Sequence, residues 1–261
     1  MEISGARVWV TGASSGIGAA LARELADRGA SVAISARNAD KLREVAGGRM
    51  HVEPLDVTDR TATVAAGAAV REALGGLDVA VLNAGTWSRF RPEQWDSQAF
   101  ADQLQTNLMG TVHALEAVVP TMIAEGLGRI VGTASVAGYR GIPGAEAYGA
   151  TKAALLNLFE SLRGSLGPRG VVVQTVAPGF VKTPMTDRNT FPMPFMVSPE
   201  AAARAIADGI AKDKAEIVFP LPMMLTMKAA RRRRRGPILP NPAGGVPGER
   251  FPRCGTPLSG G

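Results

Sequence analysis

The sequence predicts a single α/β domain, in which a parallel sheet of about seven strands carries helices on both faces. Three observations predict this class. Short apolar runs alternate with segments of helical periodicity, and no internal repeat interrupts the alternation. Glycine-rich or polar motifs directly follow several of these runs, as they do where parallel strands end beside a ligand. The chain of 261 residues is long enough to form one large core.

The apolar runs are the candidate strands, and the segments between them are the candidate helices. Strands are expected at residues 7–10, 31–35, 51–55, 77–82, 129–133, 171–176 and 216–219. Two long helical regions are predicted, from about residue 92 to 125 and from about 145 to 166. Ser198, with Glu200 in the first turn, predicts the start of a last helix that ends near Ala211.

Composition favours a soluble globular protein. The chain is 46% hydrophobic and 20% charged, and no apolar run approaches the roughly 20 residues that a membrane helix needs. The N-terminal residues have neither the basic region nor the apolar segment of a secretory signal. Because Cys254 is the only cysteine, no internal disulfide can form. We therefore expect a cytoplasmic location and no membrane partner.

The net charge of +6 is confined to the C-terminal segment of the sequence. Residues 231–261 contain seven arginines and one acid, whereas residues 1–230 contain 22 basic and 22 acidic residues. The body of the protein is therefore neutral, and the basic isoelectric point says nothing about the domain itself.

A glycine-rich turn follows the first strand and precedes a helical pattern. In such a turn Gly12 permits the tight bend, Gly16 lets the backbone approach a pyrophosphate, and Gly18 lets the helix pack on the strand. The helix N-terminus then offers unpaired N–H groups to the anion. The sequence lacks the Gly-Lys-Ser/Thr of a P-loop. We expect a dinucleotide site here; the alternative is a glycine-rich turn without a ligand.

The turn after the second strand indicates which dinucleotide is bound. A carboxylate there would accept hydrogen bonds from a free ribose 2′-hydroxyl, whereas an arginine would bind a 2′-phosphate. This chain has Ala36 and Arg37 and no acid, which favours NADP(H) over NAD(H). Alternatively, Arg37 is only a solvated turn residue. Asp56, after the third strand, is placed to hydrogen-bond the adenine edge.

Tyr148 and Lys152 are spaced to lie one turn apart on the same face of a helix. A fixed ammonium beside the phenol would favour the phenolate and bring the tyrosine pKa toward the working range. The spacing alone is common on helices and is usually structural. Ser135, however, falls at the carboxyl end of the fifth strand, near where such a pair would meet a ligand. Asn107 lies among apolar neighbours, where an amide is usually a satisfied structural group.

With these residues assembled, the chain resembles the short-chain dehydrogenase/reductase family over roughly residues 4–220. The matching motifs are Thr11-Gly12-x-x-x-Gly16-Ile17-Gly18, Asp56-Val57, Asn83-Ala84-Gly85, Asn107, Ser135, Tyr148-x-x-x-Lys152 and Pro178-Gly179. The family usually has Asn where this chain has Leu82. The resemblance implies a Rossmann-type, doubly wound sheet and one catalytic and cofactor-binding domain over residues 1–225.

The resemblance also implies roles for individual residues. Tyr148 would exchange a proton with the carbonyl or alcohol oxygen, and Lys152 would hold the nicotinamide ribose. Ser135 would bind the substrate oxygen, and Asn107 would steady a relay water. The implied cofactor-binding residues are Gly12, Ser14, Ser15, Gly16, Ile17, Gly18, Arg37, Asp56, Val57, Asn83, Ala84, Gly85, Tyr148, Lys152, Pro178, Gly179, Val181 and Thr183. No metal is implied, since the histidines are isolated and Cys254 lies near the C-terminus.

Apolar residues outside the motifs are the candidates for substrate binding. They are Trp87, Phe90, Tyr139, Ile142, Met185, Phe191, Met193, Phe195 and Met196. Residues 184–199 are interpreted as a lid, although these side chains could equally pack the domain. We expect an NADP(H)-dependent oxidoreductase that interconverts a ketone or aldehyde and an alcohol on a largely apolar small substrate. The alternatives are a 3-oxoacyl-thioester reductase and a noncatalytic NADP(H)-binding sensor or scaffold.

The segment 226–261 differs in composition from the rest of the chain. The last 26 residues contain six prolines and seven glycines, which predicts disorder. The run Arg231–Arg235 is the only feature that suggests nucleic acid or an anionic membrane, and neither is expected to be the main partner. The abrupt change of composition is also what a reading-frame change would produce. The family resemblance implies a homodimer or homotetramer.

Overall fold

The computed structural model describes residues 1–187, 189, 191–220 and 222–223. Its centre is a seven-stranded sheet in the order β3-β2-β1-β4-β5-β6-β7, in which all neighbouring strands are parallel. The strands are β1 (Arg7–Thr11), β2 (Ser31–Ser35), β3 (His51–Val52), β4 (Val79–Leu82), β5 (Gly128–Thr133), β6 (Val171–Pro178) and β7 (Glu216–Phe219). The strand order confirms the doubly wound, Rossmann-type sheet.

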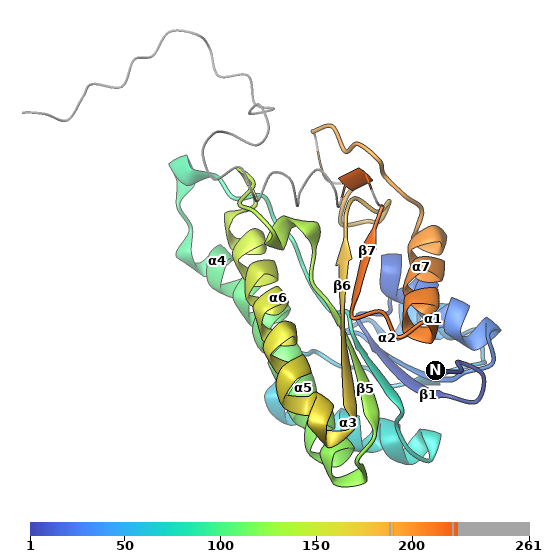
Figure 1. The fold of residues 1–261 in the computed structure, drawn as a ribbon. Helices are drawn as coiled ribbons and strands as arrows, with labels where there is room; N and C mark the ends of the chain where they lie inside the picture. Colours follow the sequence, from blue (N-terminus) through green and yellow to red (C-terminus); the bar gives the residue numbers. More distant parts are fainter. Residues whose placement is uncertain (188, 190, 221, 224–261) are drawn as a thin grey trace, which may run out of the picture.

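Helices cover both faces of the sheet (Figure 1). They are α1 (Gly16–Asp27), α2 (Ala39–Ala46), α3 (Arg60–Leu74), α4 (Ser97–Leu104), α5 (Gly110–Glu125), α6 (Glu146–Leu166) and α7 (Pro199–Ala211). Short 3₁₀ turns occupy Pro92–Gln94, Val136–Gly138 and Gly167–Arg169. Helices α1 and α7 pack together on one face, while α3, α5 and α6 lie on the other (Figure 1).

Strand β1 shows how the sequence builds the two core layers. Successive side chains of a strand point to opposite faces. Val8 and Val10 therefore enter the layer beneath α1 and α7, and Trp9 enters the layer beneath α3 and α5. Trp9 is fully buried, and its indole Nε1 donates to Ser35 Oγ at 2.8 Å. The polar tip of this large apolar side chain thus has the partner that burial requires.

The predicted helical region from about residue 92 to 125 is present, but it is divided into several elements. Helices α4 and α5 are separated by a π-helical turn, Gln105–Met109, and a 3₁₀ turn precedes them. Gly110 begins α5, and a Cβ on it would lie only 2.6 Å from Val57 Cγ2. A π turn inserts an extra residue and changes the direction of the side chains around it. Here it places Asn107 in the interior, fully buried.

The third strand is shorter than predicted, while the last helix begins where expected. Strand β3 comprises only His51–Val52, and Pro54 lies just beyond it, where a backbone N–H would face the open edge of the sheet. The N–H groups of Glu53 and Leu55 still bond to carbonyls of the adjacent segment, at 3.0 Å each. At α7, Ser198 Oγ accepts the backbone N–H of Ala201 at 3.1 Å, as the predicted cap requires.

The segment 226–261, with the run Arg231–Arg235, lies outside the described residues. Among the helices that the structure does describe, none combines the length and apolarity needed to cross a membrane.

Candidate active site

The glycine-rich turn after β1 is shaped by close contacts. Gly12 and Gly16 have φ of +69° and +57°, in the left-handed region that favours glycine. A Cβ on Gly12 would lie 2.6 Å from Ala84 Cα, and one on Gly18 would lie 2.3 Å from the Gly12 carbonyl oxygen. A Cβ on Gly16 would lie 2.9 Å from Thr183 Cγ2. The turn is therefore enclosed by the segments after β4 and β6.

The ends of β1 and β4 are joined by side-chain hydrogen bonds. The Thr11 hydroxyl oxygen lies 3.1 Å from the Asn83 N–H and 3.3 Å from the Ala84 N–H. Asn83 Nδ2 lies 3.3 Å from the carbonyls of both Thr11 and Gly12. The Asn83-Ala84-Gly85 motif thus anchors the glycine-rich turn.

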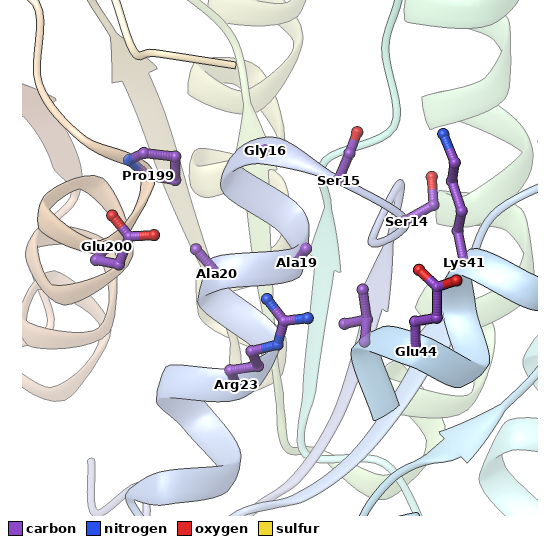
Figure 2. A pocket seen from close by; sticks show the side chains of 11 residues that line it. Ser14, Ser15, Gly16, Ala19, Ala20, Arg23, Lys41, Glu44, Pro199 and Glu200 are labelled. Carbon is purple, nitrogen blue, oxygen red and sulfur yellow. The ribbon is translucent and has the colours of Figure 1, made fainter. Parts of the chain in front are cut away.

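The N-terminus of α1 opens onto a cavity of about 310 Å³ (Figure 2). Ser15 occupies the cap position but makes no side-chain cap bond, and the first turn has no acid. Figure 2 shows the hydroxyls of Ser14 and Ser15 and the Lys41 amine directed toward the same side. The cavity lining consists of Ser14, Ser15, Gly16, Ala19, Ala20, Arg23, Lys41, Glu44, Val45, Pro199 and Glu200. The backbone donors, the two hydroxyls and the cations Arg23 and Lys41 make a donor set that fits the phosphates of a dinucleotide.

Two cations after β2, of which Lys41 lines this cavity, form no ion pair among the residues that the structure describes. Arg37, directly after β2, and Lys41, on α2, are both exposed. The neighbouring Arg43, in contrast, is paired with Asp40 at 2.6 Å. Arg37 and Lys41 are therefore free to meet an anionic ligand.

Ser135, Tyr148 and Lys152 meet at the carboxyl end of β5. The Ser135 hydroxyl is hydrogen-bonded to the Tyr148 side chain, and it accepts the Ala137 N–H at 3.1 Å. Lys152 Nζ donates to the Thr133 carbonyl at 2.8 Å and lies 5.6 Å from the centroid of the Tyr148 ring. The structure thus brings together three of the four predicted catalytic side chains.

The protonation equilibria of this cluster are governed by burial. Burial raises the pKa of Tyr148 above its ordinary value, and the hydrogen bond from Ser135 opposes that shift. Burial lowers the pKa of Lys152 from 10.5 to about 8. The expected lowering of the tyrosine pKa is therefore not supplied by the protein groups. The lysine ammonium points to a backbone carbonyl instead of the phenol oxygen.

Asn107, the fourth predicted residue, joins the cluster through its amide. Its Oδ1 accepts the Thr86 N–H at 2.7 Å, and its Nδ2 donates to the Thr86 carbonyl at 3.0 Å and to Thr151 Oγ1 at 3.1 Å. A Cβ on Gly85 would lie 3.3 Å from Asn107 Oδ1 and 3.7 Å from Lys152 Nζ. The side chain of Asn107 therefore connects the segment after β4 to α6.

The segment after β6 closes over the glycine-rich turn. The Pro178 carbonyl lies 3.3 Å from Ser135 Oγ, and the Gly179 N–H donates to Phe219 O at 2.7 Å. Further along, Thr186 Oγ1 donates to the Val181 carbonyl at 2.7 Å and accepts the Thr183 N–H at 2.9 Å. These bonds hold the segment of the predicted cofactor-binding residues Val181 and Thr183 in place against Gly16.

The segment after β3 is held by local hydrogen bonds. Asp56 Oδ1 accepts both the N–H and the hydroxyl of Thr58, at 3.0 and 2.9 Å. The Val57 carbonyl lies 2.9 Å from His113 Nδ1. One carboxylate oxygen of Asp56 is thus engaged in a turn, and the contact with adenine stays a prediction.

Some of the residues proposed for substrate binding are buried in the domain, and others are exposed on its surface. Phe90 is buried and packs edge-on against Trp95 and Phe100. Tyr139 is also buried, and its hydroxyl bonds to Glu216. In the predicted lid, by contrast, Phe195 is 53% exposed.

The two loops that carry Phe90 and Tyr139 meet beside α6. The Phe90 N–H donates to the Gly144 carbonyl at 2.9 Å.

In the predicted lid, Phe191 packs edge-on against Phe180, with ring centroids 6.0 Å apart, while Met185 and Met196 are exposed. Part of the predicted apolar set therefore packs the domain.

Comparison with known proteins identifies the class to which this fold and cluster belong. Residues 6–192 match the family model of short chain dehydrogenases. An uncharacterized oxidoreductase of Myxococcus xanthus is 38% identical over 247 residues, covering 92% of this chain and 95% of the relative. A gluconate 5-dehydrogenase of Gluconobacter oxydans is 36% identical over 193 residues, covering 72% and 75%.

Solved structures agree with this assignment. A short-chain dehydrogenase from Streptomyces avermitilis superposes with a TM-score of 0.77 at 26% identity, covering 87% of this chain and 93% of the other. The chain therefore belongs to the short-chain dehydrogenase/reductase family. It is an NAD(P)-dependent oxidoreductase that acts on CH–OH groups.

Sequence reasoning missed three residues beside this site. Lys41 lies in the first turn of α2, close in sequence to Arg37, and a second cation so near the turn after β2 is the signal that would have found it. Thr151 precedes Lys152 directly, and its hydroxyl contacts Asn107. Thr86 contributes only backbone groups to Asn107, so no side-chain pattern would have identified it.

Proposed function

We propose that this protein is an NADP(H)-dependent carbonyl reductase or alcohol dehydrogenase with Tyr148 as its proton donor and acceptor. The observation that carries the proposal is the meeting of Ser135, Tyr148 and Lys152 at the carboxyl end of β5. In an open parallel sheet, ligands bind at this end of the strands. Nucleotide binding alone needs no such cluster, which argues against a noncatalytic sensor or scaffold.

Each residue of the cluster has a role that its contacts support. In reduction, Tyr148 gives its proton to the substrate oxygen, which Ser135 orients by a hydrogen bond. The Lys152 ammonium stabilises the resulting tyrosinate electrostatically and holds the nicotinamide ribose. Asn107 steadies the segment after β4. It also steadies a water that relays a proton back to Tyr148. The nicotinamide, when bound, supplies or accepts the hydride.

The choice of NADP(H) over NAD(H) rests on charge. Arg37 follows β2 where a carboxylate would select a 2′-hydroxyl, and Lys41 lies on the cavity beside Ser14. Both cations are unpaired within the described part of the chain, whereas Arg43 on the same helix is neutralised by Asp40. A 2′-phosphate would supply the anionic partner that Arg37 and Lys41 lack within the described part of the chain. The remaining cofactor contacts are proposed at the positions named from the sequence.

The substrate proposed is a small, largely apolar ketone, aldehyde or secondary alcohol. Exposed Met185, Phe195 and Met196 in the segment 184–199 support this class, since a lid with an apolar surface would cover an apolar substrate. The named activity of the Gluconobacter relative favours a polar sugar acid instead. Turnover of a panel that contains apolar ketones, gluconate and a 3-oxoacyl thioester separates these possibilities. A preference for gluconate or for the thioester would contradict the proposed apolar substrate.

Tyr148→Phe tests the acid–base role. The variant keeps the ring and removes only the hydroxyl, so kcat should fall by at least about 100-fold, as expected for the loss of a general acid. Affinity for NADPH, measured by fluorescence titration, should change by less than about threefold, because the ring still fills the site. A variant with undiminished turnover would show that Tyr148 is not the proton donor.

Arg37→Ala and Lys41→Ala test the nucleotide preference. Each should raise KM for NADPH about tenfold, the loss expected for one charge-assisted hydrogen bond, and leave KM for NADH nearly unchanged. Arg43→Ala is the matched control, because this exposed arginine on the same helix is already paired with Asp40. If wild-type enzyme used NADH as well as NADPH, the proposed preference would be wrong.

We also propose that the protein acts as a homodimer or homotetramer. Helices α5 and α6, which carry or adjoin the candidate site, would form the main interface. Light scattering of the purified protein measures the mass directly, and a monomer at micromolar concentration would contradict the proposal. A cytoplasmic location is proposed with it.

A further inference from the structure

Thr151 lies between Tyr148 and Lys152 on α6, and none of the roles above uses it. The side chain is fully buried. Its Oγ1 donates to the Tyr148 carbonyl at 2.7 Å and accepts Asn107 Nδ2 at 3.1 Å. A hydroxyl that both donates and accepts thus bridges two candidate catalytic residues.

This bridge extends a chain of hydrogen bonds that begins after β4. Thr86 presents its N–H and carbonyl to the Asn107 amide at 2.7 and 3.0 Å. The second N–H of the Asn107 amide goes to Thr151. Both amide hydrogens of Asn107 are therefore used, one by Thr86 and one by Thr151. The backbone of Thr86, after β4, is thus linked to the backbone of Tyr148 through the side chains of Asn107 and Thr151.

The buried hydroxyl of Thr63 shows how the contacts of Thr151 differ from those of a hydroxyl that is satisfied locally. Thr63 on α3 is also fully buried, and its Oγ1 donates to the Asp59 carbonyl at 2.6 Å. Such a bond to the preceding turn satisfies the hydroxyl locally and involves one helix. Thr151 makes the same kind of bond but also receives a donor from the π turn before α5. Only the second contact crosses between elements.

We propose that Thr151 is a positioning residue that fixes Tyr148 relative to Asn107 and the segment after β4. The inference rests on the proposed function, since it assigns Thr151 a role through Tyr148. The hydroxyl is required because valine would place a methyl against an amide N–H that is buried and beyond the reach of water. Without the bridge, α6 can shift relative to Ser135, and a displacement of about 1 Å can lower a rate about 100-fold.

The test compares Thr151→Ala with Thr151→Ser, which differ only by the hydroxyl. Thr151→Ala should lower kcat by about 10- to 100-fold while the Kd for NADPH stays within about twofold. Thr151→Ser should restore kcat to within about threefold of wild type. Thr151→Val, with nearly the volume of threonine, should match Thr151→Ala in kcat if it folds. Thr63→Val is the control, because it removes a comparable buried hydroxyl on α3 that bonds only to the Asp59 carbonyl, and it should keep kcat.

The outcomes separate this inference from the proposed function. Equal kcat values for Thr151→Ala and Thr151→Ser would overturn the inference, because the hydroxyl would then be dispensable. So would a loss of kcat matched by an equal loss in the fraction of molecules that bind NADPH, since that result reports unfolding. If Tyr148→Phe kept full turnover, the proposed function itself would fail, whatever the Thr151 variants did.

Discussion

Lys152 carries a charge whose burial has a measurable consequence for stability. The side chain is only 3% exposed, and burial lowers its pKa from 10.5 to about 8. That depression corresponds to about 3 kcal/mol, since each tenfold change in a protonation equilibrium is about 1.4 kcal/mol. Replacing Lys152 by methionine removes the charge and keeps most of the volume. It also leaves the Thr133 carbonyl without its 2.8 Å donor, a loss of about 1 kcal/mol. The variant should therefore be about 2 kcal/mol more stable than wild type at pH 7.

The sign of the pH dependence follows from which state holds more protons. Below pH 8 the lysine is charged in both native and unfolded chains, so the native state carries the full destabilisation. Between about pH 8 and 10.5 the native lysine has lost its proton while the unfolded one keeps it, and wild-type stability rises with pH. Above that range the advantage of Lys152→Met should vanish.

Urea unfolding of nucleotide-free protein at pH 7 and pH 10.5, at one protein concentration and ionic strength, measures both values. Lys212→Met is the control, because this lysine is exposed at the end of α7 and should change stability by less than about 0.5 kcal/mol at either pH. A Lys152→Met protein that is less stable than wild type at pH 7, or whose advantage persists at pH 10.5, would refute the reasoning. Turnover should fall at least about 100-fold in the same variant.

Two further substitutions test the framework around the site. Gly18→Ala should weaken NADPH binding at least about tenfold, because its Cβ would lie 2.3 Å from the Gly12 carbonyl and displace the glycine-rich turn; an unchanged Kd in a fluorescence titration would contradict this. Phe159→Ala should lower the free energy of unfolding by about 3–5 kcal/mol, because the ring is fully buried against Gly132 of β5. A loss under about 1 kcal/mol in urea unfolding would show that the core of α6 rearranges to fill the space.

The sequence was sufficient to predict the fold and the grouping of the candidate residues, because both follow from the strand pattern. Parallel strands place their carboxyl ends at one edge, so Gly12, Asn83 and Ser135 had to meet there once the strands were recognised. The helix of Tyr148 was predicted nearly to its observed bounds, since its apolar face has a regular period.

The features that sequence reasoning missed depend on contacts between distant segments. The π turn at Gln105–Met109 is accompanied by the close approach of Gly110 to Val57 and by the bonds of Asn107 to Thr86, none of which is local in sequence. The direction of the Tyr148 pKa was missed for the same reason. Spacing shows which charge is near, whereas the extent of burial depends on the whole fold.

The electrostatics of Lys152 connect the stability of the fold to its proposed chemistry. Burial is the sole cause of its lowered pKa, and no carboxylate among the described residues compensates the ammonium. Around it, the polar atoms of Asn107 and Thr151 have partners inside the protein, so the local structure is otherwise well satisfied. An uncompensated buried charge in such surroundings is destabilising and is typical of functional sites. The groups that would compensate it are a tyrosinate at Tyr148 and the hydroxyls of a bound ribose. We therefore expect NADPH to raise the pKa of Lys152 on binding.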